Sequence, residues 1–560
     1  VSRGNQAVGV GFGAGLGGSG VLINTKSNND IIISGSNLSA LTANDIYASG
    51  WGVGLGSNQV IDAGGKLTIA GYASGSFPGN VFGIASQFSS HSFLKSGGDM
   101  LLAASTPNSV SGSNSGFNTG SGAIDLGTVI YSGGALTVEN AVLSTWSGQN
   151  GGASGTSITN VATPAASPIQ SSAAGFAVTN YTPVSYNGVS YSNTRAVGNI
   201  SISAQSASLA IYSGSSILSS SGSISLNGSA SAGTAVMLQV VYSSPVIVAT
   251  QSAAYGDITI RGISSGSTGS GVMLRGNGST VVAVDAAKNL TLSGYSAGTS
   301  SESYAIFKTV EGDGLLKSGS NMLLAGSAPN GGANSYVMAF NKMPIYAGGN
   351  LTIEGASSSA DPMPGASVLG AQTAIFLNNQ NSISYTSPFT NSTSSYAYNI
   401  AQGNIWISGE TTGTTGQGGI DSRAQINSMN GSVTLVGKGT SYIVSDCANN
   451  TCLAPVSSSM GINSKGLLSI TATSTGLNDS YNYALVMKGS LASQGGISLT
   501  SYGVAGAGAI FASALITNSG APGIVISSYS DVYLSGLQNS GSAGIRVTAG
   551  RDIAAGTITG

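Results

Sequence analysis

A short pattern of apolar and polar residues recurs along the chain. Each copy begins with Gly or a small polar residue, continues with an apolar, any, apolar triplet, and ends with a small residue or Gly. Copies include "GKLTIAG" at 65–71, "GDMLLAA" at 98–104, "GDITIRG" at 256–262 and "GNLTIEG" at 349–355. Alternation with a period of two predicts β-strands that send one side chain inward and the next outward. The flanking glycines predict tight turns.

Consecutive copies are often spaced by about thirty residues. The first apolar residues Ile258, Leu290 and Met322 are 32 residues apart each time, and a second, looser strand pattern lies between copies, as in "VFGIAS" at 81–86. Such a unit buries its apolar face only by stacking on its neighbours. A β-propeller is the rival, but its blades need about 40–50 residues. We therefore predict an all-β fold, a right-handed parallel β-helix (β-solenoid) with loop insertions and roughly eighteen coils at a rise of about 4.8 Å each.

A larger repeat lies above the single coil. "KSGGDMLLAAS" at 95–105 returns as "KSGSNMLLAGS" at 317–327, with eight of eleven positions identical. We predict one continuous β-solenoid over 1–560, with duplicated multi-coil blocks at about 29–228 and 256–437 and further coils over 438–560. Asp62 and Lys95 in the first block match Asp285 and Lys317 in the second. One active site does not need its acid twice, so we expect structural roles for these four residues.

The repeated Asn of "GNL", "GNI" and "KNL" lies at a predicted turn, as at 349–351, 403–405 and 288–290. Asn tolerates turn backbone conformations and hydrogen-bonds neighbouring backbone. Stacked on itself from coil to coil, it is expected to form an amide ladder.

Composition narrows the partners. Of 560 residues only 6% are charged, 41% are hydrophobic and 85 are Gly, and the formal net charge is −2. A disordered Gly/Ser linker lacks such ordered apolar triplets. We expect no nucleic-acid partner, because no basic stripe is present to neutralise phosphates. We also expect no membrane span, because no apolar run reaches the roughly 18–20 residues required.

Candidate chemistry is sparse, and we predict that the protein is not an enzyme. The only histidine, His91, lies far from the two cysteines, so a metal site and a serine triad are both disfavoured. Gly-x-Gly spacings at 9–20 precede no helical pattern, so no dinucleotide cofactor is expected. Cys447 and Cys452 in "DCANNTC" are predicted to form a local disulfide. The catalytic candidates are the acids outside the duplicated pairs: Glu302, Glu311, Asp313, Asp361, Glu410 and Asp421. None of them pairs with another acid in one repeat beside a base and an aromatic platform.

Tyrosines in three loop-like stretches offer a binding hypothesis. Exposed Tyr among Ser and Asn makes adaptable polar contacts and stacks on sugars, so these residues are candidate adhesive aromatics. The alternative is that their rings cover the flanks of the solenoid where loops fold back. The candidates are Tyr181, Tyr186, Tyr191, Tyr385, Tyr396 and Tyr398.

The chain resembles the filamentous-haemagglutinin-like exoproteins of two-partner secretion, and more loosely the passenger domains of autotransporters. The phrases "GGKLTIAG", "GNISISA", "GGNLTIEG" and "GNIWISG", with "AGRDIAAGTITG" at 549–560, carry the resemblance. It implies a secreted bacterial protein, at the cell surface or shed, that serves adhesion or forms a scaffold, with a host, surface or glycan ligand.

Two alternatives stay open. The chain begins and ends within the repeat pattern, which is typical of a segment of a longer protein or of end coils that meet head to tail in a filament. The minor alternative is a polysaccharide-degrading enzyme, since parallel β-helices also host such sites and paired acids carry glycoside hydrolysis.

Overall fold

The computed structural model divides the chain into two compact units, unit 1 over Val1–Gly256 and unit 2 over Asp257–Gly560. Each unit is described by itself. The structure describes residues 6–12, 22–25, 28–37, 49–55, 59–73, 81–86, 92–106, 122–126, 128–139, 176–178, 184–191, 193–206, 209–240, 244–298, 303–329, 336–355, 373–379, 382–411, 418–439, 442–443, 452–453, 456–475, 482–503 and 507–560.

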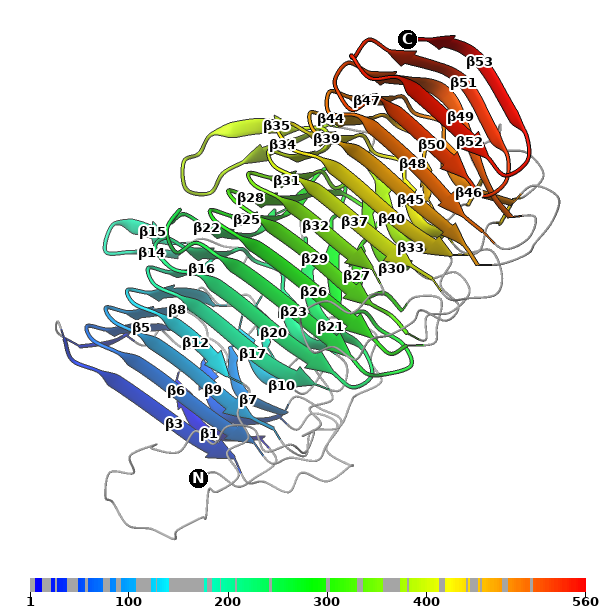
Figure 1. Cartoon of the computed structure of the whole chain (residues 1–560). Helices are drawn as coiled ribbons and strands as arrows, with labels where there is room; N and C mark the ends of the chain where they lie inside the picture. Colours follow the sequence, from blue (N-terminus) through cyan, green and yellow to red (C-terminus); the bar gives the residue numbers. More distant parts are fainter. Residues whose placement is uncertain are drawn as a thin grey trace. The chain divides into compact units, whose positions relative to one another are not determined.

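Unit 1 is built from three ladders of parallel strands, and the chain visits them in turn (Figure 1). Ladder A consists of β3 (Ile31–Asn37), β6 (Leu67–Ala73), β9 (Met100–Ser105), β12 (Leu136–Glu139), β17 (Ile200–Ser206) and β20 (Ile224–Ala230). Ladder B consists of β1 (Gln6–Phe12), β4 (Ser49–Leu55), β7 (Val81–Ser86), β10 (Gly122–Leu126), β13 (Phe176–Val178), β18 (Leu209–Ser213) and β21 (Thr234–Gln239). Ladder C consists of β2 (Leu22–Asn24), β5 (Val60–Ala63), β8 (Phe93–Ser96), β11 (Val129–Ser132), β16 (Thr194–Ala196), β19 (Ile217–Ser219) and β22 (Val246–Thr250).

Unit 2 repeats the same three ladders. Its ladder A consists of β23 (Ile258–Ser264), β26 (Leu290–Ser296), β29 (Met322–Ser327), β32 (Leu351–Gly355), β37 (Ile405–Glu410), β40 (Val433–Gly439), β45 (Leu468–Ser474), β48 (Ile497–Tyr502), β50 (Ile524–Ser528) and β52 (Ile545–Ala549). Its ladder B consists of β24 (Val272–Arg275), β27 (Ile306–Lys308), β30 (Tyr336–Asn341), β33 (Thr373–Asn378), β38 (Gly418–Ser422), β43 (Val456–Ser458) and β46 (Asn482–Met487). Its ladder C consists of β25 (Val281–Ala286), β28 (Asp313–Ser318), β31 (Ile345–Ala347), β36 (Asn399–Ala401), β39 (Ile426–Ser428), β44 (Ile462–Ser464) and β47 (Leu491–Ser493). Three longer strands then run through both B and C: β49 (Ala507–Asn518), β51 (Val532–Asn539) and β53 (Ile553–Thr559).

The core of each unit lies between its ladders. Each inward residue stacks on the residue at the equivalent position of the next coil. Leu67 pairs with Met100 in unit 1, and Leu290 pairs with Met322 in unit 2. All four are at most 2% exposed. This packing is the predicted one, and the all-β parallel β-helix is confirmed as the fold class. The handedness and the single continuous solenoid over 1–560 stay predictions.

Ladder C is the part of the coil that the sequence pattern missed. Most of its strands have three or four residues, too short to show a clear alternation. In β5 and β8 only the second and last residues point inward, and the outward positions include Asp62 and Lys95. The coil therefore has three strands, where the pattern indicated two.

The turn between ladders C and A contains a polar ladder, but its hydrogen bonds differ from those of the predicted amide ladder. Side-chain oxygens accept hydrogen bonds from the backbone N–H one coil further on, instead of pairing amide with amide. In unit 2 the backbone N–H of Asn321 donates to Asn289 Oδ1 (3.2 Å). The backbone N–H of Asn350 donates to Asn321 Oδ1 (3.0 Å), and that of Asn404 donates to Asn350 Oδ1 (2.8 Å). Asp257 begins this run by accepting from Asn289 (3.1 Å). Asp and Asn serve equally, because only an acceptor oxygen is required.

Short antiparallel hairpins interrupt the coils. They are β14 (Val184–Tyr186) with β15 (Val189–Tyr191), β34 (Ile383–Thr386) with β35 (Thr393–Tyr396), and β41 (Tyr442–Ile443) with β42 (Cys452–Leu453). Cys452 lies in β42, whereas Cys447 is outside the described residues, so the disulfide stays a prediction. Within the described ranges, no helix is long and apolar enough to cross a membrane.

Candidate functional site

Two of the hairpins are inserted at the same point of the coil, between a ladder B strand and the next ladder C strand. The β14–β15 hairpin precedes β16, and the β34–β35 hairpin precedes β36. In unit 1 the turn is Asn187–Gly188, and both residues have positive φ (49° and 76°), as a two-residue hairpin turn of type I′ requires. In unit 2 the connection is longer, spanning 387–392 between the paired Thr386 and Thr393.

The unit 1 hairpin covers the outer face of ladder C. Its two tyrosines pack on Phe93, with ring centroids 5.5 Å away for Tyr186 and 4.6 Å for Tyr191. Tyr191 also meets Tyr131 of β11 edge-on at 5.3 Å. Phe93 points outward from β8 and is nevertheless fully buried. The hairpin is therefore a lid on an apolar patch of the solenoid.

An ion pair lies under this lid. Lys95 Nζ donates to both carboxylate oxygens of Asp62, at 2.9 and 3.0 Å, and its ammonium lies 5.8 Å from the Tyr186 ring centroid. Burial alone lowers the pKa of Lys95, but its hydrogen bond to Asp62 and the charge of Asp62 raise that pKa overall. Burial, with the nearby Asp62, raises the pKa of Tyr186. The pair joins consecutive coils, β5 and β8.

Unit 2 contains the same arrangement. Lys317 Nζ donates to both oxygens of Asp285, at 2.8 and 3.0 Å, across β28 and β25. Tyr396 meets Tyr346 of β31 edge-on at 5.8 Å, as Tyr191 meets Tyr131 in unit 1. Tyr385 is 3% exposed, and its hydroxyl donates to Asp285 Oδ2 at 3.0 Å. Burial, with the charge of Asp285, raises the pKa of Tyr385.

The structure therefore brings together four of the six candidate tyrosines with the duplicated Asp–Lys pairs, two tyrosines to each pair. Tyr398 is 39% exposed and follows β35, and Tyr181 lies outside the described residues. Rings that pack on the solenoid flank fit the covering interpretation at Tyr385. The adhesive role of these tyrosines stays a prediction.

The remaining candidate acids are dispersed. Glu410 pairs with Lys438 (2.6 Å) and Asp421 with Arg423 (3.2 Å), while Glu311 approaches Arg275 at 3.7 Å on an exposed surface. Asp313 begins β28. Among the described residues, no group of three or more His, Cys, Asp or Glu is placed to hold a metal. Glu302, Asp361 and His91 lie outside the described residues.

Lys308 is a buried cation that the sequence did not reveal. It is fully buried at the end of β27, and its ammonium donates to the carbonyl oxygens of Thr309 (2.8 Å), Glu311 (3.0 Å) and Gly312 (3.0 Å). Burial lowers its pKa to about 8, partly opposed by the charge of Asp313. The three carbonyls enclose the ammonium in its own turn, so the lysine holds that turn together.

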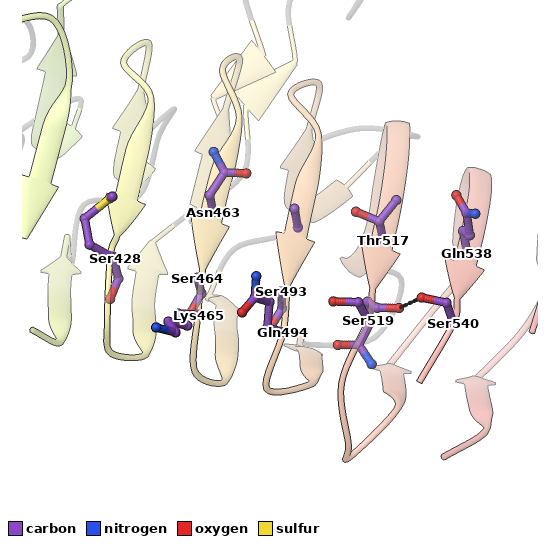
Figure 2. A pocket seen from close by; sticks show the side chains of 13 residues that line it. Ser428, Asn463, Ser464, Lys465, Ser493, Gln494, Thr517, Ser519, Gln538 and Ser540 are labelled. Atoms are coloured by element: carbon purple, nitrogen blue, oxygen red, sulfur yellow. Dashed lines mark hydrogen bonds between the residues drawn. The ribbon is translucent and has the colours of Figure 1, made fainter. Parts of the chain in front are cut away.

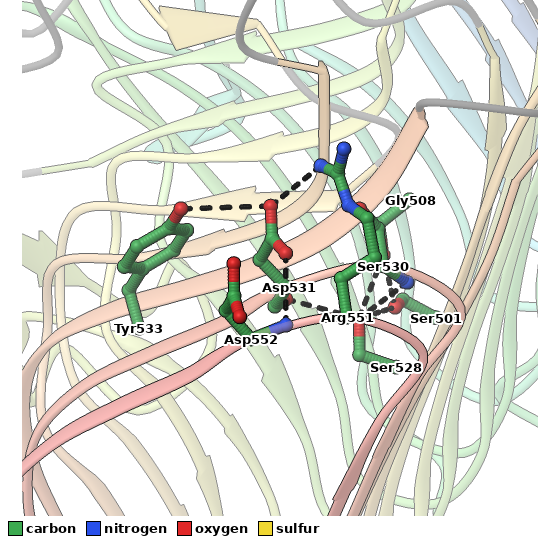
Figure 3. Close-up of polar contacts among 8 residues, drawn as sticks. All are labelled: Ser501, Gly508, Ser528, Ser530, Asp531, Tyr533, Arg551 and Asp552. Atoms are coloured by element: carbon green, nitrogen blue, oxygen red, sulfur yellow. Dashed lines mark hydrogen bonds and ion pairs between the residues drawn. The ribbon is translucent and has the colours of Figure 1, made fainter.

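Figure 3 shows one more polar cluster, near the end of unit 2. Arg551 Nη2 pairs with Asp531 Oδ2 at 2.6 Å, and the Asp552 backbone N–H donates to Asp531 Oδ1 at 3.1 Å. Beside them the hydroxyls of Ser501 and Ser528 share the carbonyl oxygen of Gly508. These contacts again link one coil to the next.

An open groove of about 620 Å³ crosses several coils of unit 2 on the outer face of ladder C (Figure 2). One wall is a single register row of outward side chains, Asn463, Ala492, Thr517 and Gln538. No sequence motif indicated it, because each coil contributes at most three polar residues.

The opposite wall of the groove follows each strand by one residue. It includes Lys465, Gln494, Ser519 and Ser540, and their backbone N–H groups each donate to the preceding coil. Met429, 51% exposed, stands at one end. The groove holds one cation and no carboxylate among its lining residues.

Comparisons with known proteins add no relative. No family model, no curated protein and no solved structure matches the chain.

Proposed function

We propose that this chain is a non-catalytic, secreted bacterial β-helical scaffold that mediates attachment to a surface. The observation that carries the proposal is the use of charge in both units. Asp62–Lys95 and Asp285–Lys317 are partly buried, and each joins consecutive coils under a tyrosine-bearing hairpin. Charged side chains that pair between consecutive coils stabilise the stack of coils, as a scaffold requires.

Two further properties support the proposal. The sequence resembles filamentous-haemagglutinin-like exoproteins in its repeated "GNLTIEG"-type phrases. A solenoid also forms by adding coil to coil, so no distant contact has to form early. That mode of folding suits a chain exported in an extended state.

The test is surface display. The chain is displayed on a non-adherent bacterial strain, and cell retention under flow is measured on glass, on plastic and on surfaces coated with neutral or charged polysaccharides. We expect retention on at least one surface above that of cells displaying an unrelated β-solenoid of similar length. Retention equal to that control on every surface would contradict the proposal.

The filament alternative predicts a different result in the same material. Electron microscopy of purified protein at increasing concentration distinguishes the two: end-to-end polymers favour the filament, and single particles at every concentration favour the attachment scaffold. For the enzyme alternative, release of reducing sugar from the coating polysaccharides is the readout.

A further inference from the structure

Ladder C is covered in one stretch of unit 2 and open in another. A single register row runs through Asp285, Lys317 and Tyr346, and further along through Asn427 and Asn463 to Gln538. The β34–β35 hairpin lies over the first part, through Tyr385 on Asp285 and Tyr396 on Tyr346. The groove lies over the last part. The outer face of ladder C is thus covered by a hairpin in one stretch. A few coils later the same face forms a groove that is open to solvent.

The chemistry of the open stretch differs from that of the covered stretch. Where the hairpin docks, the row contains an acid and a base. In the groove it contains amides, a hydroxyl and the small Ala492. Among the described residues, the side chains of Gln494, Ser519 and Gln538 have no hydrogen-bond partner, and Gln494 and Gln538 are exposed. These groups are available to an external ligand.

The groove favours one class of ligand. An extended peptide needs free backbone N–H and C=O groups to add as a strand, but in the groove floor these groups are already paired between coils. A polyanion needs several cations, whereas Lys465 is the one cation in the lining. A neutral chain with hydroxyls along both edges fits two walls of amides and hydroxyls, and its C–H faces fit Ala492 and Met429.

We propose that this groove binds a neutral oligosaccharide chain laid across the coils. The coil rise of about 4.8 Å is close to the length of one sugar ring, and every coil from Asn463 to Gln538 except that of Ala492 presents a polar side chain from both walls. This inference rests on the proposed attachment function and names the ligand class of that function.

The test is affinity gel electrophoresis of the full chain. The gels contain hydroxyethylcellulose, galactomannan or arabinoxylan as neutral probes, and polygalacturonate or heparin as charged probes. We expect retardation by at least one neutral probe. Retardation by the charged probes alone, or by none, would overturn the inference.

Variants locate the binding in the groove. The Gln494→Ala/Gln538→Ala double variant removes two amides, and we expect its affinity to fall about thirtyfold through the loss of two hydrogen bonds. Ala492→Trp fills the groove without removing a polar group and abolishes retardation. Circular dichroism and thermal unfolding confirm that each variant is folded. Groove variants that bind as the unmodified chain does would contradict the inference.

Gln251→Ala is the matched control. Gln251 follows β22 of ladder C in unit 1, is exposed, and donates its backbone N–H to Ser219 as Gln494 does to Ser464. It lies outside the groove, so its loss leaves retardation unchanged. If displayed groove variants still hold cells to every surface as before, the groove inference fails while the attachment function stands. If the purified chain binds a neutral probe but displayed cells attach to nothing, the attachment function fails instead.

Discussion

Each unit has one cluster in which a tyrosine-bearing hairpin covers an Asp–Lys ion pair. The two clusters differ in the ladder C residues that lie under the hairpin, here called the floor. In unit 1 Tyr186 stays half-buried, and its hydroxyl accepts a hydrogen bond from Asn24 Nδ2 at 3.4 Å. In unit 2 the equivalent Tyr385 is 3% exposed and donates to Asp285 at 3.0 Å. The ion pairs beneath them are nearly identical in length. The two clusters differ in the burial of the hairpin tyrosine, not in the ion pair.

The difference follows from the residues under each hairpin. The floor in unit 1 is made by Val60 and Phe93, whereas the same register positions in unit 2 hold Ala283 and Leu315. The Phe93 ring lies under both tyrosines of the unit 1 hairpin. Unit 2 has the smaller Leu315 at that position, and there Tyr385 is buried against Asp285. We expect the volume of this residue to set how deeply the hairpin tyrosine is buried beside its carboxylate.

The largest expected loss of local stability follows from substituting Phe93, the floor residue under the unit 1 hairpin. Phe93→Ala removes a fully buried ring that contacts both hairpin tyrosines, and we expect a loss of about 3–5 kcal/mol in local stability. Hydrogen exchange of the β14 and β15 amides measures it, because a long repeat protein has no single unfolding free energy. Leu315→Ala is the paired variant, with a smaller loss of about 2–3 kcal/mol at β34–β35. Equal losses in the two hairpins would show that floor volume does not distinguish them.

Asp285→Ala is expected to cost more than Asp62→Ala. In unit 2 the substitution leaves both Lys317 and the buried Tyr385 hydroxyl without their acceptor, a loss of about 2 kcal/mol. In unit 1 Lys95 loses its partner and Tyr186 loses the carboxylate beside it. Tyr186 is only half-buried and keeps its contact with Asn24, so we expect a smaller loss of about 1 kcal/mol. Amide exchange in the two hairpins is again the readout, with the reverse order counting against the comparison.

Tyr385→Phe separates the hydroxyl from the ring. We expect a loss of about 1.5 kcal/mol at β34–β35 near neutral pH, and less than about 0.5 kcal/mol at β14–β15 for the control Tyr186→Phe.

The same pair of variants tests the raised pKa of Tyr385. Because the folded-state pKa lies above the unfolded-state value of about 10, the stabilisation is complete below pH 10 and is lost as pH rises beyond it. Exchange measured from pH 7 to pH 11 should show the advantage of Tyr385 over Phe shrinking above pH 10. An advantage that stays constant to pH 11 would argue against the hydroxyl–carboxylate bond.

The smallest effect concerns the turn ladder. Asp99 Oδ1 accepts from the Ala135 N–H at 2.9 Å, and Asn321 Oδ1 accepts from the Asn350 N–H at 3.0 Å. Asp99→Asn therefore changes local stability by less than about 0.5 kcal/mol, while Asn321→Ala costs about 1 kcal/mol. Exchange at the Ala135 and Asn350 amides measures both, and a large effect of Asp99→Asn would show that the charge itself matters.

The sequence by itself determined the fold class, the stacked apolar rows of ladder A and the duplication. Alternation in copies such as 65–71 and 349–355 reports burial directly, because one side chain in two must face the core. The pairing of Asp62 with Asp285 and of Lys95 with Lys317 was also readable, since the duplicated phrases align.

Only the tertiary structure decided what lies on the outer faces. Ladder C strands are too short to show a period, and Asp62 meets Lys95 because the coil returns the chain to the same face 33 residues later. The hairpin tyrosines reach their floors from coils further along the chain, at separations set by insertions of irregular length. The groove is likewise assembled from two or three residues per coil. Such sites depend on which residues the stacking brings into one row, and no local stretch of sequence contains that information.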